Sequence, residues 1–462
     1  MKVTLKHTYT FLFLLGVFFI PFNSYEGISF LGEYRRDGAI IFFLLSFVFF
    51  GIDRLYKEKI EVPQQNLFFQ ILILFVLCIV LSTICNGHSI YGSYMKQTSG
   101  ASRFFRQFLS LTIALLLFIT SYNITRNYSL KAFFFLIRKV FLYSFIFVSI
   151  YGFLEILVVY FNIKTLKSVL LLFDYVPFID VFLDFKFSRI SSVSYEPPFL
   201  AIYLITIAGW MFSYILTAKG IKKYVPTLIV FLLTFFSGSR TALIVVSFQF
   251  LMFIGLVITI NRRVQLIMQR FLVLVSIVVV LLFALNGGKV SKAIETKIES
   301  LSFSKNLSDN ISNKSRLGIQ YTSLLIFLEN PILGVGFGQQ AFHARNKYPK
   351  WATSNNYEFR LFYLNDKVKS FPPGYNIYTR LLAETGIIGF LIFTSFIGLI
   401  LYQCKKLINN RVDIEKFIPI VLLISFMGFA INWLQFDSLR VYGFWICLAI
   451  LIRQLQGRNE NE

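Results

Sequence analysis

The chain has little charge and few of the residues that usually bind metals or carry catalysis. Only 15% of its 462 residues are charged, whereas 56% are hydrophobic, and 56 of them are phenylalanine. A soluble domain carries about a quarter charged residues, so this composition excludes an ordinary soluble protein. Long apolar runs, with charge collected in short clusters, indicate a polytopic membrane protein.

Cysteine and histidine are scarce as well. The 4 cysteines lie in or at the ends of apolar runs and form no CxxC pair, which excludes a disulfide framework and the common zinc sites. We therefore expect neither a metal nor a cofactor. A net charge of +22 would point to nucleic acid in a soluble protein, but in a membrane protein the location of the cations matters more than their sum. We expect no nucleic-acid partner.

Apolar runs bounded by charge, glycine or proline mark the expected membrane helices, because a helix needs about 20 apolar residues to cross the bilayer core. The first run has no small-residue cleavage site after it, so we interpret it as a retained helix. About twelve runs are found. They lie near 9–22, 38–52, 67–85, 104–122, 140–161, 198–217, 224–237, 241–261, 271–286, 386–403, 417–434 and 441–453.

The expected fold is thus all-α, with about twelve transmembrane helices and one large outer loop. Residues 1–286 would hold nine helices and an outer segment near 162–197, residues 287–385 the large loop, and residues 386–462 the last helices. No internal repeat is evident by eye, which weighs against a transporter built from duplicated halves.

The distribution of lysine and arginine predicts cytoplasmic N- and C-termini, since short cytoplasmic loops are enriched in these residues. With that orientation, most cations of the short segments fall inside. The short outer loops hold only Arg35, Arg36, Lys96, Arg103, Arg106, Arg240 and Arg440.

Arg240 follows a Ser237-Gly-Ser turn after a short apolar run, so we expect it below the outer membrane surface. An arginine at that depth faces a polar cavity or a partner, because exposure to lipid costs several kcal/mol. The alternative is a snorkelling arginine at an ordinary helix end.

A second cluster runs from Arg189 through Tyr195 and Glu196 to two prolines that suit a helix start. Glu196 is either a helix-terminal charge that complements the dipole or a functional carboxylate. Glu155 lies inside an apolar run, and an intramembrane carboxylate is a functional candidate unless it has a structural partner.

Two further motifs lie in and after the large loop. Asn330-Pro-Ile-Leu-Gly-Val-Gly-Phe-Gly338 lacks the GK[ST] of a phosphate-binding loop, and as a glycine-rich turn after a helix at 316–328 it is structurally adequate. His343 follows it as a lone loop histidine. Tyr375, Asn376 and Arg380 precede Gly386 and Gly389, whose spacing allows close helix packing.

With these motifs the sequence resembles the O-antigen polymerase and O-antigen ligase superfamily of bacterial surface-polysaccharide enzymes. The markers are Ser237–Leu243, the Arg316 helix with the glycine-rich turn, and Tyr375-Asn376 followed by Gly386 and Gly389. Ligases carry a histidine where this chain has Tyr375, and that histidine is thought to be their catalytic base.

The resemblance implies a GT-C-like glycosyltransferase of the bacterial inner membrane that works on the periplasmic face without a metal. Its partners would be an undecaprenyl diphosphate-linked glycan donor and acceptor, membrane lipid, and a chain-length regulator. Arginines would bind the departing diphosphate, since guanidinium groups hold it in bidentate fashion. We expect Glu196, Arg240 and Arg316 to be catalytic, and Arg189, Tyr195, Tyr375, Asn376, Arg380 and His343 to bind substrate.

The general base stays open at this point, with Glu196 preferred over His343 and Glu155. The leading interpretation is an inverting polymerase of lipid-linked repeat units. A ligase that transfers the finished glycan to lipid A core is the enzymatic alternative, and a flippase of lipid-linked oligosaccharide is the alternative from another class.

Overall fold

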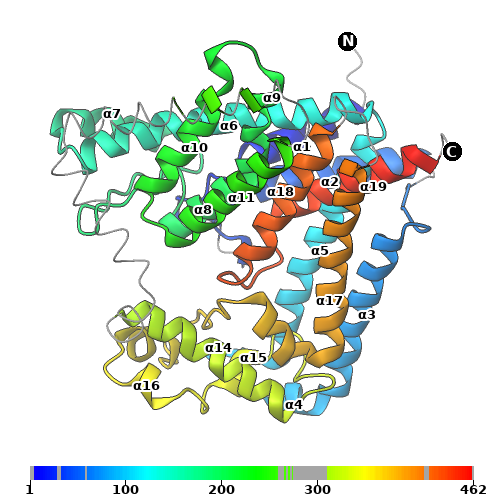
Figure 1. Ribbon diagram of the computed structural model, residues 1–462. Helices are drawn as coiled ribbons and strands as arrows, with labels where there is room; N and C mark the ends of the chain where they lie inside the picture. Colours follow the sequence, from blue (N-terminus) through cyan, green and yellow to red (C-terminus); the bar gives the residue numbers. More distant parts are fainter. Residues whose placement is uncertain are drawn as a thin grey trace.

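The computed structural model describes residues 5–28, 33–57, 60–258, 265–266, 269–270, 273, 310–409 and 416–459, and the regular secondary structure in this part of the chain is almost entirely helical (Figure 1). The expected all-α membrane fold is confirmed. Among the described residues, the β structure is limited to a hairpin of β1 (Tyr94–Met95) and β2 (Thr98–Ser99) and an isolated bridge between Asp184 and Arg189.

Seven helices in the described residues are long and apolar enough to cross a membrane. They are α2 (Gly38–Lys57), α3 (Leu67–Cys85), α5 (Gly100–Thr125), α6 (Leu130–Val159), α8 with the following α9 (Pro197–Phe212, Tyr214–Thr217), α11 (Arg240–Ile258) and α17 (Ile377–Asn409). Shorter apolar helices are α1 (Leu5–Phe18) and α18 (Phe417–Asn432), and α10 (Val225–Phe236) and α19 (Tyr442–Asn459) complete the bundle. The span expected at 271–286 lies outside the described residues, apart from Val273.

Short helices lie in the segments that connect the long ones. The segment 162–197 holds η2 (Lys164–Leu166), α7 (Lys167–Leu171) and η3 (Leu172–Tyr175), and α4 (Gly87–Gly92) precedes the hairpin. The one-turn η4 (Ile221–Lys223) lies before α10. The large loop, described from residue 310, contains α14 (Ile311–Glu329), α15 (Gln340–Ala344), α16 (Lys350–Thr353) and the π-helical turn η5 (Phe359–Tyr363).

Helix α8 forms the centre of the bundle, where it packs against α10, α11 and α18. Its residues are apolar on every side, as expected for a helix enclosed by other membrane helices. The carbonyls of Ile205 and Ile424 both accept hydrogen bonds of 3.1 Å from Gln249 Nε2, which joins α8, α18 and α11. Such polar contacts, together with small residues, hold helices together where lipid removes the hydrophobic driving force.

Helix α17 is broken at Gly386, which has a φ of 63°. A Cβ at this position would lie 2.2 Å from the carbonyl oxygen of Ile332, so only glycine fits against the glycine-rich turn. Backbone amides of that turn donate to α17 in return: Val335 to the Ala383 carbonyl and Gly336 to the Glu384 carbonyl, both at 3.0 Å. The glycine-rich motif is therefore a packing element that fixes the large loop onto α17.

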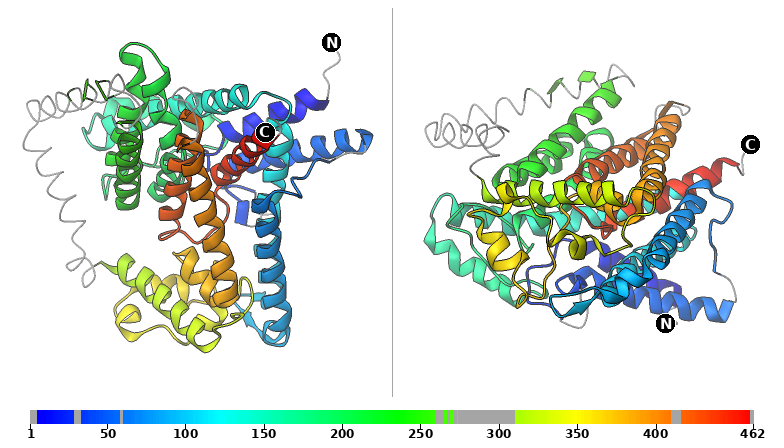
Figure 2. Two further views of the ribbon diagram at one scale, coloured as in Figure 1. Left: turned by 45° about the vertical axis from the view of Figure 1, so that its right-hand side comes forward. Right: turned by 90° about the horizontal axis from the view of Figure 1, so that it is seen from below.

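The two ends of the chain lie on one side of the molecule. Figure 1 shows both termini at the upper right, whereas α14 and α16 of the large loop lie at the lower left, and the left view of Figure 2 likewise has both termini above the large loop. The long helices α3, α5 and α17 connect these regions. This relative placement agrees with a large loop on the side opposite the termini.

Candidate functional site

Arg240 is the first residue of α11 and follows a tight turn that ends α10. Ser239 Oγ accepts a hydrogen bond of 3.3 Å from the amide of Ala242 and so caps the new helix. Gly238 has a φ of 69°, and a Cβ there would lie 2.8 Å from Cγ of Arg189. The glycine thus lets the Arg189 side chain pass directly over the turn that carries Arg240.

Arg189 comes from the outer segment before α8 and is tied to the same turn. The amide of Ile190 donates to the Phe236 carbonyl at 3.2 Å, and the Arg189 guanidinium lies 4.7 Å from the centre of the Phe187 ring. The segment is also anchored from within the membrane, because the fully buried Glu155 carboxylate accepts from the amides of Ser191 (3.2 Å) and Ser192 (2.8 Å).

Arg316 reaches this region from the large loop, on the first turns of α14. Its guanidinium lies 5.1 Å from the centre of the Tyr375 ring and donates to Gln435 Oε1 at 3.3 Å. Nε of Arg316 is buried and has no hydrogen-bond partner among the described residues. The Tyr375 ring and Gln435 thus fix the guanidinium but leave a donor unused.

These three arginines form what we call the arginine cluster. The charges of Arg189 and Arg316 both act on Arg240, so the groups lie within electrostatic range of one another. None of the three forms an ion pair with a carboxylate in the part of the chain that the structure describes. Like charges held together without a counter-charge favour the binding of an anion, and guanidinium groups suit a phosphate.

Glu196 immediately precedes α8 and is exposed, and its side chain makes no capping hydrogen bond. Desolvation by the surrounding protein raises the pKa of this carboxyl, whereas the positive charge of Arg36 acts in the opposite direction. Arg36 itself stacks on Tyr195, with its guanidinium 3.5 Å from the ring centre. In the sequence Arg36 is only one of the cations of a short loop, and its contact with Tyr195 cannot be predicted because the two residues belong to segments distant in the chain.

Tyr375 and Asn376 have structural partners. The Tyr375 hydroxyl lies 2.5 Å from that of Tyr363, and burial raises its pKa. Asn376 Oδ1 accepts from the amides of Tyr378 (2.9 Å) and Thr379 (3.3 Å), so it caps the start of α17. These contacts position Tyr375 beneath Arg316.

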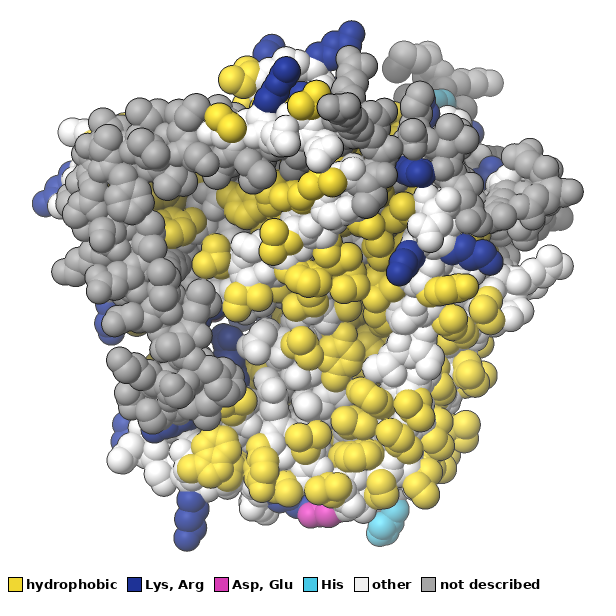
Figure 3. All heavy atoms as spheres, viewed as in Figure 1, with side chains coloured by type: hydrophobic (Ala, Val, Ile, Leu, Met, Phe, Trp, Pro, Cys, Tyr) yellow, Lys and Arg dark blue, Asp and Glu magenta, His cyan; other side chains and the backbone are white. Residues whose placement is uncertain are grey.

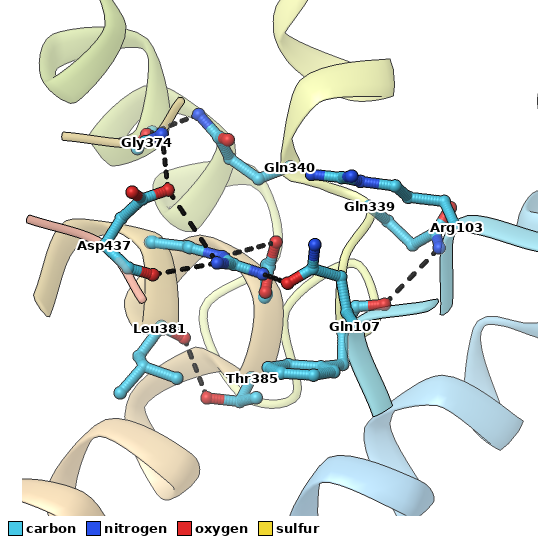
Figure 4. Close-up of polar contacts among 12 residues, drawn as sticks. Arg103, Gln107, Gln339, Gln340, Gly374, Leu381, Thr385 and Asp437 are labelled. Atoms are coloured by element: carbon cyan, nitrogen blue, oxygen red, sulfur yellow. Dashed lines mark hydrogen bonds and ion pairs between the residues drawn. The ribbon is translucent and has the colours of Figure 1, made fainter. Parts of the chain in front are cut away.

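Arg380 belongs to a buried polar network, of which Figure 4 labels Gln107, Gly374 and Asp437. It pairs with Glu384 at 3.1 Å, donates to the backbone carbonyl of Asp437 at 2.8 Å, and donates to Gln107 Oε1 at 2.9 Å. The Asp437 carboxylate accepts the amide of Gly374 at 2.6 Å. The network therefore joins α5, the start of α17 and the loop between α18 and α19.

Glu33 extends this network and was not recognised from the sequence. Arg103 pairs with it at 2.8 Å, and Gln107 also donates to it. Burial raises the pKa of the Glu33 carboxyl, but Arg103, Arg440 and Arg380 together lower it more, so that the net shift is downward. The sequence offered one indication that Glu33 has a partner, namely that carboxylates are rare beside apolar runs.

His343 lies half-buried on α15, where burial and the charge of Lys347 lower its pKa. In the part of the chain that the structure describes, no ion pair or side-chain hydrogen bond joins His343 to the arginine cluster. Of the sequence-predicted residues, the structure thus brings Arg189, Arg240, Arg316 and Tyr375 together, ties Arg380 into the buried network, and leaves His343 elsewhere in the loop.

No curated protein matches this sequence. A family match covers residues 225–394, the part of the chain that contains Arg240, Arg316, Tyr375 and Arg380, while Arg189 and Glu196 precede it. The matched family is described as O-antigen ligase, and the predicted resemblance to the O-antigen polymerase and ligase superfamily is confirmed over these residues.

Proposed function

We propose that this protein is a polymerase of undecaprenyl diphosphate-linked oligosaccharide repeat units, which makes O-antigen or a similar surface polysaccharide on the periplasmic face of the bacterial inner membrane. The observation that carries this proposal is the arginine cluster, whose guanidinium groups lie within electrostatic range of one another and, among the described residues, form no ion pair with a carboxylate. Two of its members lie within the family match.

The reaction needs no nucleotide, because the donor is already activated by its lipid diphosphate. An acceptor hydroxyl attacks the anomeric carbon, the bond from that carbon to the diphosphate oxygen breaks, and the configuration inverts. The arginine cluster stabilises the negative charge that develops on the diphosphate, without a metal. Arg189 and Arg240 approach from the membrane bundle, and Arg316 from the large loop.

The proton of the attacking hydroxyl passes to Glu196 in this proposal. Its side chain is exposed, and a carboxyl with a raised pKa accepts a proton more readily than an ordinary glutamate. Glu155 serves less well, because its oxygens already accept two backbone amides. Tyr375 is a poor base since its phenol stays protonated, and it orients Arg316 instead.

The other predicted contacts remain proposals for the sugar chains. Tyr195, stacked on Arg36 beside Glu196, offers a ring edge and a hydroxyl to the acceptor. Asn376, Arg380 and His343 stay candidate sugar contacts, with the reservation that Asn376 and Arg380 already hold structural partners.

A ligase is the second candidate, and the description of the matched family favours it. Tyr375 argues against it, because a tyrosine replaces the histidine expected of a ligase. The cell's glycan ladder distinguishes the two. Deletion of a polymerase leaves single repeat units attached to the surface lipid, whereas deletion of a ligase leaves none attached. A deletion strain without any attached repeat unit would contradict the polymerase.

A further inference from the structure

On helix α14 the buried face is largely small or hydroxylated, and the exposed face carries large apolar side chains. The face that packs on the protein is made of small and hydroxylated residues with two isoleucines: Ser315, Gly318, Ile319, Thr322, Ser323 and Ile326. The opposite face exposes Tyr321, Leu324 and Leu328 to 47, 40 and 70%. Their spacing of three and four residues places them on one side. A helix on a water-soluble domain shows the reverse arrangement, with leucines inside.

The polar residues on the inner face have partners within the protein. Gln340 Nε2 donates to Ser323 Oγ at 2.9 Å, and Asn356 Nδ2 donates to Ser315 Oγ at 2.9 Å. Gly318 lies against Ala352, where a Cβ would approach the alanine Cβ to 2.4 Å. Small residues that allow close packing, together with hydrogen-bonded hydroxyls, are typical of the protein-facing side of a helix in a membrane.

The exposed side of α14 continues into the surface of a membrane-spanning helix. Ile332 follows α14 and is 63% exposed, and the neighbouring Pro331 carbonyl accepts the amide of Ile387 at 2.8 Å. Ile388 and Leu391 of α17 are exposed next along this side. In Figure 3, hydrophobic side chains cover the lower part of the molecule from the large loop across to α17 and α3.

The ends of α14 limit how it can meet a bilayer. Residues 317–328 contain no charge, and Arg316 and Glu329 flank them. This stretch is about 18 Å long at about 1.5 Å per residue, too short to cross a hydrocarbon core of about 30 Å. Trp351 is half exposed, with its ring 6.3 Å from that of Tyr321. Tryptophan and tyrosine concentrate at the boundary between headgroups and acyl chains.

We propose that the apolar face of α14, defined as Tyr321, Leu324, Leu328 and Ile332, lies in the bilayer against the acyl chains of membrane lipids. The large loop then enters the membrane along this helix and does not stand wholly in water. Arg316, at the start of the uncharged stretch, is held at the level of the lipid headgroups. This inference concerns the lipid contact alone and does not require the proposed reaction.

Site-specific fluorescence quenching tests the contact. Cys85 is exposed and is replaced by serine, while the other cysteines are buried. Leu324→Cys or Leu328→Cys is labelled with an environment-sensitive NBD dye, and the full chain is placed in vesicles of phosphatidylethanolamine and phosphatidylglycerol. The acyl chains are either plain or brominated. We expect both labels to lose most of their fluorescence in brominated vesicles and to change little when iodide is added on both sides of the membrane.

Lys367→Cys is the matched control, because Lys367 is an exposed residue of the same loop. Its label should respond to iodide and not to brominated lipid. Labels at 324 and 328 that behave like the label at 367 would place α14 in water and overturn the inference. Labels that neither quencher reaches would show that protein covers this face, which would overturn it equally.

Discussion

Arg380 is bound to Asp437 through both the backbone and the side chain of the aspartate. Its Nη1 donates to the Asp437 carbonyl at 2.8 Å and lies 3.7 Å from the carboxylate Oδ2. The contact joins α17 to the loop between α18 and α19, and Glu384 and Gln107 also contact the guanidinium. Figure 4 labels Asp437 and Gln107 of this network. Arg380 therefore has the carboxylate partners that, among the described residues, the arginine cluster lacks.

Replacement of Arg380 by alanine should destabilise the protein. The change leaves the buried Glu384 carboxylate without its cation, and breaking a buried ion pair in this way costs about 3–5 kcal/mol. Thermal unfolding of the purified protein in detergent should show a clearly lower midpoint than that of Arg316→Ala. Equal midpoints for the two variants would contradict the structural role assigned to Arg380.

Arg240→Ala and Arg316→Ala should abolish polymer formation while protein in the membrane stays at its normal level. Loss of one bidentate contact to the diphosphate costs a few kcal/mol in the transition state, or roughly a hundredfold in rate. Lysine should rescue poorly because it offers a point charge instead of a planar fork. The glycan ladder measures the effect, with Arg360→Ala in the same loop as control. Normal polymer formation by Arg316→Ala would show that Arg316 is a solvated loop charge without a role in the reaction.

Glu196→Gln should eliminate turnover and preserve donor binding, since the amide keeps the shape of the carboxylate but cannot accept the proton. Tyr375→Phe should keep measurable activity, because the ring that contacts Arg316 remains. Turnover of a lipid-linked donor by the purified variants measures both. An active Glu196→Gln with an inactive Tyr375→Phe would move the chemistry to the 375–376 motif and favour a ligase-like mechanism.

The pH dependence of turnover should report Glu196 and its neighbour Arg36. A base must be ionised, so activity falls as the pH drops through its pKa, and the raised pKa of Glu196 puts this fall above the usual range of a glutamate. The charge of Arg36 lowers that pKa, so Arg36→Gln should move the fall to higher pH, while Arg36→Lys should leave it nearly in place. An acidic limb that Arg36→Gln leaves unmoved would separate Glu196 from the proton transfer.

Reporter fusions test the orientation. Fusions after Lys223 and Lys406 should behave as cytoplasmic, and fusions within 300–370 as external, because the cations of the short loops concentrate on the side of the termini. A fusion near Lys350 that reports a cytoplasmic location would remove the large loop from the periplasm, and the proposed site with it.

Much of the helical framework could be predicted from the sequence. The apolar run at 67–85 coincides with α3, because the length and hydrophobicity of a membrane helix are local properties of the chain. The break at Gly386 was visible only as a glycine pair that allows close packing. Its positive φ follows from the approach of Ile332, a contact that local sequence does not encode.

The candidate site, too, could be predicted only in part. Arg189, Arg240 and Arg316 could be recognised in the sequence as arginines at motif positions predicted to lie on the outer side. Arginines beside membrane segments are rare and usually have a functional or structural partner. The three charges lie close together because of the turn at Gly238 and the placement of α14, which only the folded chain shows. Glu155 shows the limit most clearly. Its burial could be predicted, but its partners are the backbone amides of Ser191 and Ser192, which every residue type except proline would provide.

The sequence by itself determined that the chain is a helical membrane protein, which motifs it carries and which charged residues lie near apolar runs. The tertiary structure decided which of those charges are paired. Arg380 and Gln107 are far apart in the chain, and so are Arg103 and Glu33, yet each pair makes direct contact. A hydrophobic run predicts a membrane helix because its preference for lipid is a local property of the sequence. An ion pair forms only where the packing of the fold brings two distant segments together. For that reason the arginines that lack a carboxylate partner among the described residues can be identified only in the folded protein.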